Sequence, residues 1–300
     1  MTTTTTPTTY PAPLADPTDR LSTRRRRRRW QSGEITLLLS LSALSLIVVA
    51  TLAAPWLTPH DPNQQVLAQR LAPSSAAQWL GADQLGRDLL ARILYGGRAS
   101  LWLATVAVLL SGSIGVIIGL VAGRNGGLFD EFVMRLVDVL IVFPGIVLAL
   151  VIAALLKPGF GSLLLALTIT GWTTYARLTR ALTLEVLARP FIEAALAVGL
   201  SERRLLLRYV LPNISGPLLA MTFLRFGHTL LTVAALSYLG VGVQPPTPDW
   251  GAMLAEAQPY MQRAPRLLIA PALLIFLTAL SVTLIGQGLT LRFDPHYRRA

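Results

Sequence analysis

The sequence is poor in the side chains that carry out most chemistry. It has no cysteine, which excludes a disulfide framework and a thiolate metal site. Its three histidines, His60, His228 and His296, are too scattered to propose a metal cluster. Neither a phosphate-binding glycine loop, nor a Ser/His/Asp set, nor an HExxH motif occurs. The chain therefore lacks a recognisable catalytic constellation and cannot hold ATP by the usual loop.

Charge is also scarce, and apolar residues dominate. Only 14% of the 300 residues are charged and 53% are hydrophobic, which indicates a polytopic membrane protein. Apolar segments of about 20 residues, the length that crosses a bilayer, recur six times. They lie near 35–57, 99–122, 132–156, 161–178, 214–239 and 267–290. The fourth is the weakest because four threonines dilute it: Thr168, Thr170, Thr173 and Thr174.

The basic residues predict the orientation of these spans. With six spans, the tails and loops on the side of the two termini carry 18 Arg and Lys, against 7 in the opposite loops. Positive charge is retained in the cytoplasm, so both termini and the loop around residues 179–213 are predicted to be cytoplasmic. Residues 34–291 then form the membrane domain and residues 292–300 a cytoplasmic tail.

The N-terminal tail, residues 1–33, is rich in Thr and Pro and then in Arg, and is predicted to lack structure. The run Arg24 to Arg29 beside Trp30 could bind nucleic acid or acidic lipid, but an anchor that keeps this end in the cytoplasm is the favoured interpretation. The apolar segment Ile35 to Leu57 is longer than the core of a secretory signal, which favours a retained first span.

The longest polar interval between two apolar segments is 193–212, EAALAVGLSERRLLLRYVLP. It predicts two short amphipathic helices that are broken at Gly199. Ser201 is expected to cap the second helix, and Pro212 to end it. Such a pair suits a groove on a soluble partner, while an ordinary cytoplasmic loop is the alternative.

Three further patterns carry local predictions. Leu85, Leu89 and Ile93 recur at helical spacing and predict an amphipathic helix at the membrane surface or pore mouth. Arg135 and Asp138 can pair on one helix face. Pro144 is expected to kink the third span.

Two ionisable residues, Arg225 and His228, fall inside the fifth span. They are three residues apart, share a helix face, and are expected to point into the bundle or a wet cavity. They are candidates for the substrate path, with His228 as a candidate metal ligand. Hydrogen bonding between helices is the alternative, and one histidine alone makes a poor metal site.

The spacing in residues 193–212 resembles the EAA loop of permease subunits of bacterial ABC importers, with Tyr209 in the place of the usual isoleucine. The segment 81–100 and the segment 236–251 resemble the second permease of dipeptide, oligopeptide and nickel importers, with Tyr238 replacing phenylalanine. The resemblance covers roughly residues 35–296. It implies an ATPase-docking site formed by Glu193, Ala194, Ala195, Gly199, Ser201, Arg204, Leu211 and Pro212.

The resemblance implies an all-α permease of the type I importer fold, with six transmembrane helices and cytoplasmic coupling helices, in the bacterial inner membrane. Its expected partners are a homologous permease subunit, two ATP-binding subunits that hold ATP and Mg, an extracytoplasmic solute-binding protein and membrane lipid, but no nucleic acid. The chain itself is expected to bind no cofactor. The expected cargo is a di- or oligopeptide or similar small solute, with nickel or a metal chelate as the alternative. A channel or a membrane-embedded enzyme is the rival class.

Overall fold

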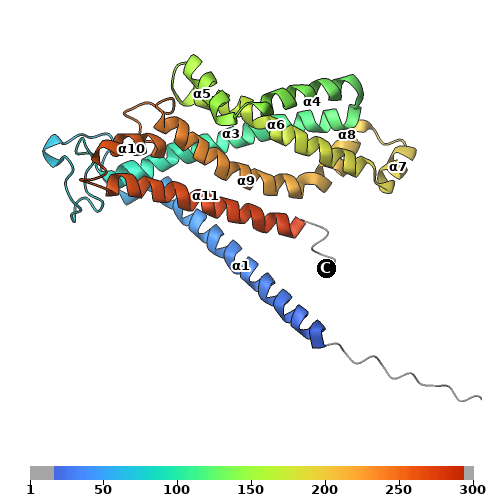
Figure 1. The fold of residues 1–300 in the computed structure, drawn as a ribbon, viewed down its shortest axis with the longest axis horizontal. Coiled ribbons are helices and arrows are strands. Elements are labelled where there is room, and N and C mark those ends of the chain that lie inside the picture. Colours follow the sequence, from blue (N-terminus) through green and yellow to red (C-terminus); the bar gives the residue numbers. More distant parts are fainter. Residues whose placement is uncertain (1–16, 294–300) are drawn as a thin grey trace, which may run out of the picture.

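The computed structural model describes the backbone of residues 17–293 and the side chains of residues 34–293. This part of the chain is built of helices without a β-strand, which confirms the all-α prediction. Apart from the N-terminal helix, which diverges toward its N-terminal end, the long helices run side by side in an elongated bundle (Figure 1). The bundle has a long apolar middle and two polar ends.

The long helices are α1 (Pro17–Leu52), α3 (Leu89–Asn125), α6 (Phe160–Leu187), α9 (Leu211–Tyr238) and α11 (Arg266–Phe293). Between them lie α2 (Ala54–Leu57), α4 (Gly127–Val142), α5 (Gly145–Leu155), α7 (Pro190–Ala197), α8 (Glu202–Leu205) and α10 (Trp250–Ala257). Single turns occur at Leu67–Gln69, Leu206–Val210 and Gln258–Tyr260.

Four stretches of the described chain are long and apolar enough to cross a membrane: Glu34–Leu52, Leu89–Asn125, Glu202–Tyr238 and Arg266–Phe293. The pair α4 and α5 makes a fifth if it is counted as one broken span. The remaining predicted span, 161–178, lies within α6, which is 28 residues long but more polar because of its threonines. The number of six spans therefore stays a prediction.

The described part of the N-terminal tail differs from the expectation that residues 1–33 lack structure. Helix α1 begins at Pro17, so the backbone of residues 17–33 is helical. A helix that already exists in the apolar segment adds residues at little cost, and arginine is a good helix former. Residues 1–16 and 294–300 lie outside the described residues, with His296 and most of the predicted C-terminal tail.

Helices α4 and α5 form one broken element. They are bent by 90° at Phe143 and Pro144, a sharper break than the expected kink. Proline lacks the N–H that would continue the helix ladder, and its ring clashes with the preceding turn. The sharp turn lets α5 pack against α6 while α4 runs along the other end of α6 (Figure 1).

Ion pairs fasten α4 to α6 in a way that the sequence did not predict. Arg135 pairs with Glu131, one turn earlier, at 2.8 Å, and not with Asp138. Asp138 pairs instead with Arg177 of α6, and Asp130 pairs with Arg180 of the same helix. Asp138 faces α6, so its charge meets a long arginine from the neighbouring helix and not the arginine on its own helix.

The segment that was expected to form a surface helix from Leu85 is packed into the protein. Helix α3 begins only at Leu89, where the Asp88 carboxylate accepts a hydrogen bond from the Ala91 N–H at 2.7 Å. Leu89 and Ile93 are 1% and 3% exposed. The amphipathic pattern therefore buries its apolar side against protein and not at a membrane surface.

The charges beside that pattern are buried as well. Arg87 donates to Asp83 at 2.6 Å and to Glu256 of α10 at 2.7 Å. Arg92 donates to Glu256 at 3.2 Å. Buried charges are tolerated when each is paired in this way. The network joins the loop before α3 to α10 and closes one end of the bundle.

The start of α10 is fastened to α3 by buried polar contacts. Asp249 caps α10 by accepting from the N–H groups of Gly251 and Ala252, and the Ser100 hydroxyl donates to its carboxylate at 2.6 Å. Burial raises the pKa of Asp249, while these hydrogen bonds act in the opposite direction. The Trp250 indole N–H donates to the Ile93 carbonyl at 2.9 Å. Because these contacts join α3 to α10, the two helices form one rigid unit at this end of the bundle.

The closest packing in the bundle is between α3 and α6. Three glycines of α3, at positions 115, 119 and 123, recur one turn apart and face α6. A Cβ at Gly119 would lie 2.5 Å from the Ala176 carbonyl oxygen and 2.7 Å from the Thr179 Cβ. Small residues at such positions let two helix backbones approach and gain van der Waals contact, which is the main source of helix association in membranes.

We expect Gly119→Ala to destabilise the protein by about 1–3 kcal/mol, because the added methyl group meets backbone that cannot move without separating α3 from α6. Thermal unfolding of the purified protein in detergent measures this loss. Gly161→Ala is the matched control, because nothing lies within 4 Å of the Cβ that it adds in α6. Equal unfolding temperatures for the two variants would contradict the close-packing interpretation.

Candidate functional site

The segment 193–212 lies at one end of the bundle, opposite the end that carries α10 (Figure 1). As expected, it contains two short helices, α7 and α8, with Gly199 between them. Gly199 has φ of +78°, a left-handed conformation that side chains with a Cβ rarely adopt. A Cβ there would meet nothing within 4 Å, so the backbone angle alone accounts for the preference for glycine.

The inner face of this segment is anchored in the bundle. Ile192 of α7 is 1% exposed, and Leu205 and Val210 are fully buried. They share one apolar cluster with Leu120 of α3 and Val186 of α6. The segment is therefore packed directly against these two long helices.

The outer face is unpartnered within the described chain. Glu193, Ala194 and Arg204 are exposed, and Ala195 is partly buried at the edge of the anchoring cluster. Exposed apolar residues lie among them, including Val198 at 84% and Leu207 at 52% exposure. Apolar side chains mixed with charge of both signs are typical of a surface that binds another protein.

Two local predictions for this segment are wrong. Ser201 precedes α8, but its exposed hydroxyl makes no capping hydrogen bond. Pro212 does not end the helix, because Glu202–Tyr238 forms one continuous helical stretch. The turn Leu206–Val210, just before Leu211 and Pro212, has the wider π geometry. A π turn changes the local hydrogen-bond ladder, so a residue without an N–H is accommodated.

The structure adds an ion pair that the sequence analysis missed. Arg124, near the end of α3, donates to Glu202 at the start of α8 at 2.8 Å. The two residues are 78 positions apart, and no local spacing links them. The pair gives the segment a polar connection to α3 in addition to its apolar anchor.

Arg225 and His228 line a partly open cavity of about 230 Å³, in which Arg225 is half-buried and His228 is exposed. Its walls come from the break between α4 and α5, from α6 and from α9. No ion pair joins Arg225 to an acidic side chain within residues 34–293. The cavity thus holds a cation without a protein counter-charge, an arrangement suited to an anionic group of a ligand.

Threonines contribute much of the remaining polar lining. Thr170, Thr173 and Thr174 of α6 and Thr229 and Thr232 of α9 face this cavity. In the sequence, the threonines of α6 were noticeable only because they make the fourth apolar segment more polar. Only the packing of α6 against α9 shows that they line the same cavity as Arg225. Most of these hydroxyls donate to carbonyls of their own helix, such as Thr170 to Ala166 at 2.9 Å.

The exposed segment and the cavity are separate sites on one element. Arg204 and Arg225 lie on the same continuous stretch, Glu202–Tyr238, about 30 Å apart at 1.5 Å per residue. Among the described residues, no group of three or more His, Cys, Asp or Glu is arranged to hold a metal ion. His228 is therefore not part of a three-residue metal site within this part of the chain.

Comparisons with known proteins agree with this arrangement. Residues 115–299 match the family described as the inner membrane component of binding-protein-dependent transport systems. The di/tripeptide transport system permease protein DppC of Pseudomonas aeruginosa is 40% identical over 261 residues, covering 85% of this chain and 86% of the relative. The glutathione transport system permease protein GsiD of Pectobacterium atrosepticum is 40% identical over 270 residues, covering 89% of each chain. A crystal structure of an amino acid ABC transporter with histidines matches with a TM-score of 0.52 at 21% identity, covering 70% of this chain and 94% of that chain, and shows the fold.

Proposed function

Because this chain belongs to the family of inner membrane components of binding-protein-dependent transport systems, we propose that it forms half of a translocation path for short peptides. It is a permease subunit of an ABC importer, and so a transport subunit and not an enzyme. The observation that carries the proposal is an arginine with no acidic partner within residues 34–293, in a cavity on the same helical stretch as the exposed segment that contains α8.

The partners follow from this role. A homologous permease completes the path, two ATP-binding subunits hold ATP and Mg, and an extracytoplasmic solute-binding protein delivers the cargo. The exposed face of α7 and α8 is the surface on which an ATP-binding subunit docks. Its apolar residues and its charges of both signs support this assignment.

The contacts of the docking segment suggest how closure of the ATP-binding subunits reaches the path. A pull on α8 acts directly on α9, because the two helices are continuous through the π turn. The Arg124–Glu202 pair and the buried Leu205 carry the same movement to α3. The bundle then rocks as a unit and opens the cavity alternately to the two sides of the membrane.

Substitutions in the docking segment should stop transport without removing the protein from the membrane. Gly199→Pro should abolish uptake while the protein stays in the membrane, because proline fixes φ near −65° where the turn has +78°. It also removes the N–H that donates to the Leu196 carbonyl at 2.9 Å. Glu193→Lys should also abolish uptake, since it reverses a charge on the docking face. Substrate-stimulated ATPase activity of the reconstituted transporter measures both effects.

Gly199→Asn is the matched control, because asparagine tolerates the left-handed conformation and the added side chain meets open space. It should retain most of the activity. Normal uptake and normal ATPase stimulation in Gly199→Pro or Glu193→Lys would show that this segment does not couple the subunits.

The cargo assignment rests on Arg225. A peptide carries a terminal carboxylate, which a guanidinium binds through paired, charge-assisted hydrogen bonds. The two curated relatives are named for di/tripeptide and for glutathione transport, which supports a peptide. Nickel or a metal chelate is the alternative and would depend on His228.

We expect Arg225→Ala to lower dipeptide uptake about tenfold or more, the effect of losing roughly 1.5–3 kcal/mol of charged hydrogen bonding. Arg225→Lys keeps the charge and should retain part of the uptake. His228→Ala should leave dipeptide uptake high, and it lowers metal uptake only if the cargo is a metal species. Measuring dipeptide and nickel uptake in parallel decides between a peptide and a metal species as the cargo. Unchanged dipeptide uptake in Arg225→Ala would assign this residue a structural role.

The orientation of the chain in the membrane is inferred from the distribution of its basic residues. It places α7 and α8 in the cytoplasm and residues 81–88 on the outer side. Because the chain has no cysteine, single cysteines can report it directly. Ser75→Cys and Gln258→Cys should react with an impermeant maleimide in intact cells, whereas Glu202→Cys should react only after permeabilisation. All three positions are exposed in the structure. Labelling of Glu202→Cys from outside would reverse the orientation.

A further inference from the structure

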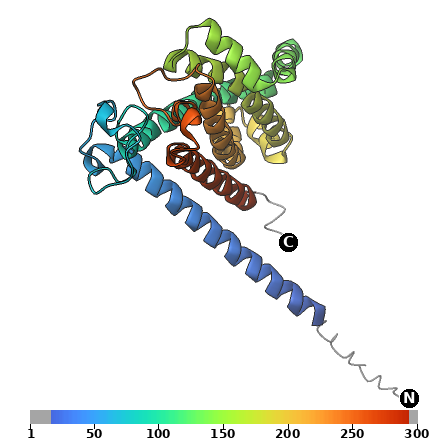
Figure 2. The same ribbon diagram turned by 60° about the vertical axis from the view of Figure 1, so that its left-hand side comes forward.

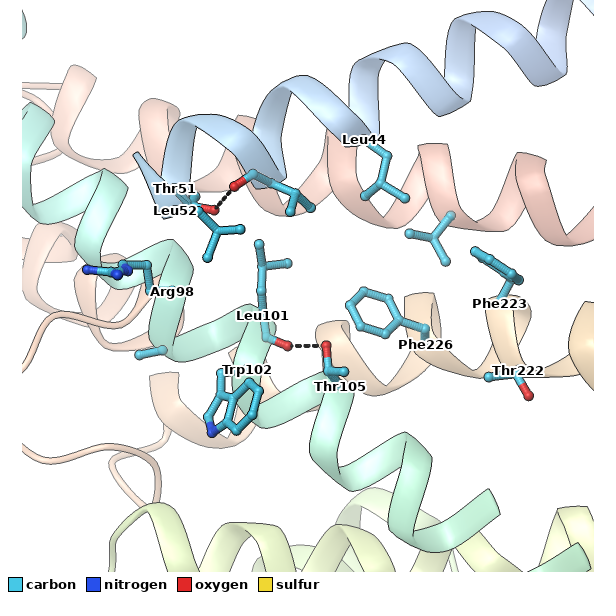
Figure 3. A pocket seen from close by; sticks show the side chains of 13 residues that line it. Leu44, Thr51, Leu52, Arg98, Leu101, Trp102, Thr105, Thr222, Phe223 and Phe226 are labelled. Atoms are coloured by element: carbon cyan, nitrogen blue, oxygen red, sulfur yellow. Dashed lines mark hydrogen bonds between the residues drawn. The ribbon is translucent and has the colours of Figure 1, made fainter. Parts of the chain in front are cut away.

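A second hollow, larger than the Arg225 cavity and unrelated to it, lies beside α1. It is a groove of about 640 Å³ between α1, α3, α9 and α11 (Figure 3). Apolar side chains form most of its walls, among them Leu44 and Val48 of α1, Trp102 of α3, and Phe223 and Phe226 of α9. Helix α1 contacts α11 where it joins the bundle, and it diverges from the bundle toward its N-terminal end (Figure 2).

The groove has a polar end and an apolar end. Arg98 lies at one end beside Leu52, the last residue of α1 (Figure 3). The opposite end, near Leu44 and Phe223, is flanked by the middle parts of α1 and α9. Along α1 the distance from residue 52 to residue 44 is about 12 Å, close to half of the roughly 30 Å hydrocarbon core of a bilayer. The groove therefore spans about one leaflet.

Arg98 is available for a ligand. It is exposed, and no ion pair joins it to an acidic side chain in the part of the chain with described side chains. Its guanidinium stands 5.7 Å from the centre of the Tyr95 ring. Trp102, one turn further along α3, is 64% exposed. Arginine, tyrosine and tryptophan together are typical of the depth at which lipid headgroups lie.

We propose that this groove binds one anionic phospholipid, with its phosphate on Arg98 and an acyl chain along Val48 and Phe226. A guanidinium and a phosphate are complementary in charge and in hydrogen-bond geometry. A transmembrane helix of a partner subunit fits less well, because it would cross both leaflets and has no need of a cation at one end. The site depends on the chain spanning the membrane and not on the cargo that it carries.

The test is lipid retention by the assembled transporter in nanodiscs of phosphatidylglycerol and phosphatidylcholine. After extraction and washing in detergent, mass spectrometry counts the phosphatidylglycerol that stays bound. Arg98→Gln should weaken retention about tenfold, the effect expected for losing a charge-assisted contact. The matched control is Arg263→Gln, an exposed arginine outside the groove, which should retain lipid like the unaltered protein. Equal retention in the two variants would overturn the proposal.

Two further variants test the groove itself. Val48→Trp fills it while leaving Arg98 in place and should lower retention to a similar extent; unchanged retention would refute an acyl chain at this position. Val48→Cys introduces the only thiol of this chain, so a bifunctional cross-linker can report what lies against it. Efficient cross-linking to the homologous permease would assign the groove to that partner and not to a lipid.

Discussion

The contact of α3 with α6 is the constraint on which the rest of the structure depends. A Cβ at Gly115 would lie 2.4 Å from the Trp172 carbonyl oxygen, so the two backbones touch where any larger residue would hold them apart. Lipid tails are as apolar as leucine, and burial of apolar surface therefore contributes little to helix association in a bilayer. Close van der Waals contact along α3 and α6 provides the rigidity that the polar ends require.

Both ends of α3 are joined to distant parts of the chain by charge. At one end Arg92 reaches Glu256 of α10, and at the other Arg124 reaches Glu202 of α8. The first pair is almost fully buried on the arginine side, while Glu202 is largely exposed. Buried pairs hold a geometry firmly because breaking them leaves an uncompensated charge, whereas exposed pairs contribute little to stability. The α10 end is thus held more firmly by its ion pair than the α8 end.

Much of the candidate site could be predicted from local pattern, whereas the exceptions depend on features that local pattern does not distinguish. The break at Gly199 follows from its position between two apolar-periodic stretches, and the shared face of Arg225 and His228 follows from a spacing of three residues. Pro212 continues its helix because a π turn, which no simple pattern indicates, precedes it. The start of α3 at Leu89 was likewise missed, since the same spacing of apolar residues fits a surface helix and a buried one.

The sequence by itself determined the class of the protein, the approximate position of its apolar segments and the two-helix character of residues 193–212. These properties depend on composition, on periodicity and on the conformational limits of glycine, all of which act over a few residues. Only the tertiary structure decided that Asp138 pairs with Arg177, that the threonines of α6 share a cavity with Arg225, and that α1 leaves a groove beside Arg98. Those arrangements join residues tens of positions apart, and they follow from how far each helix is rotated and bent when it packs against its neighbours.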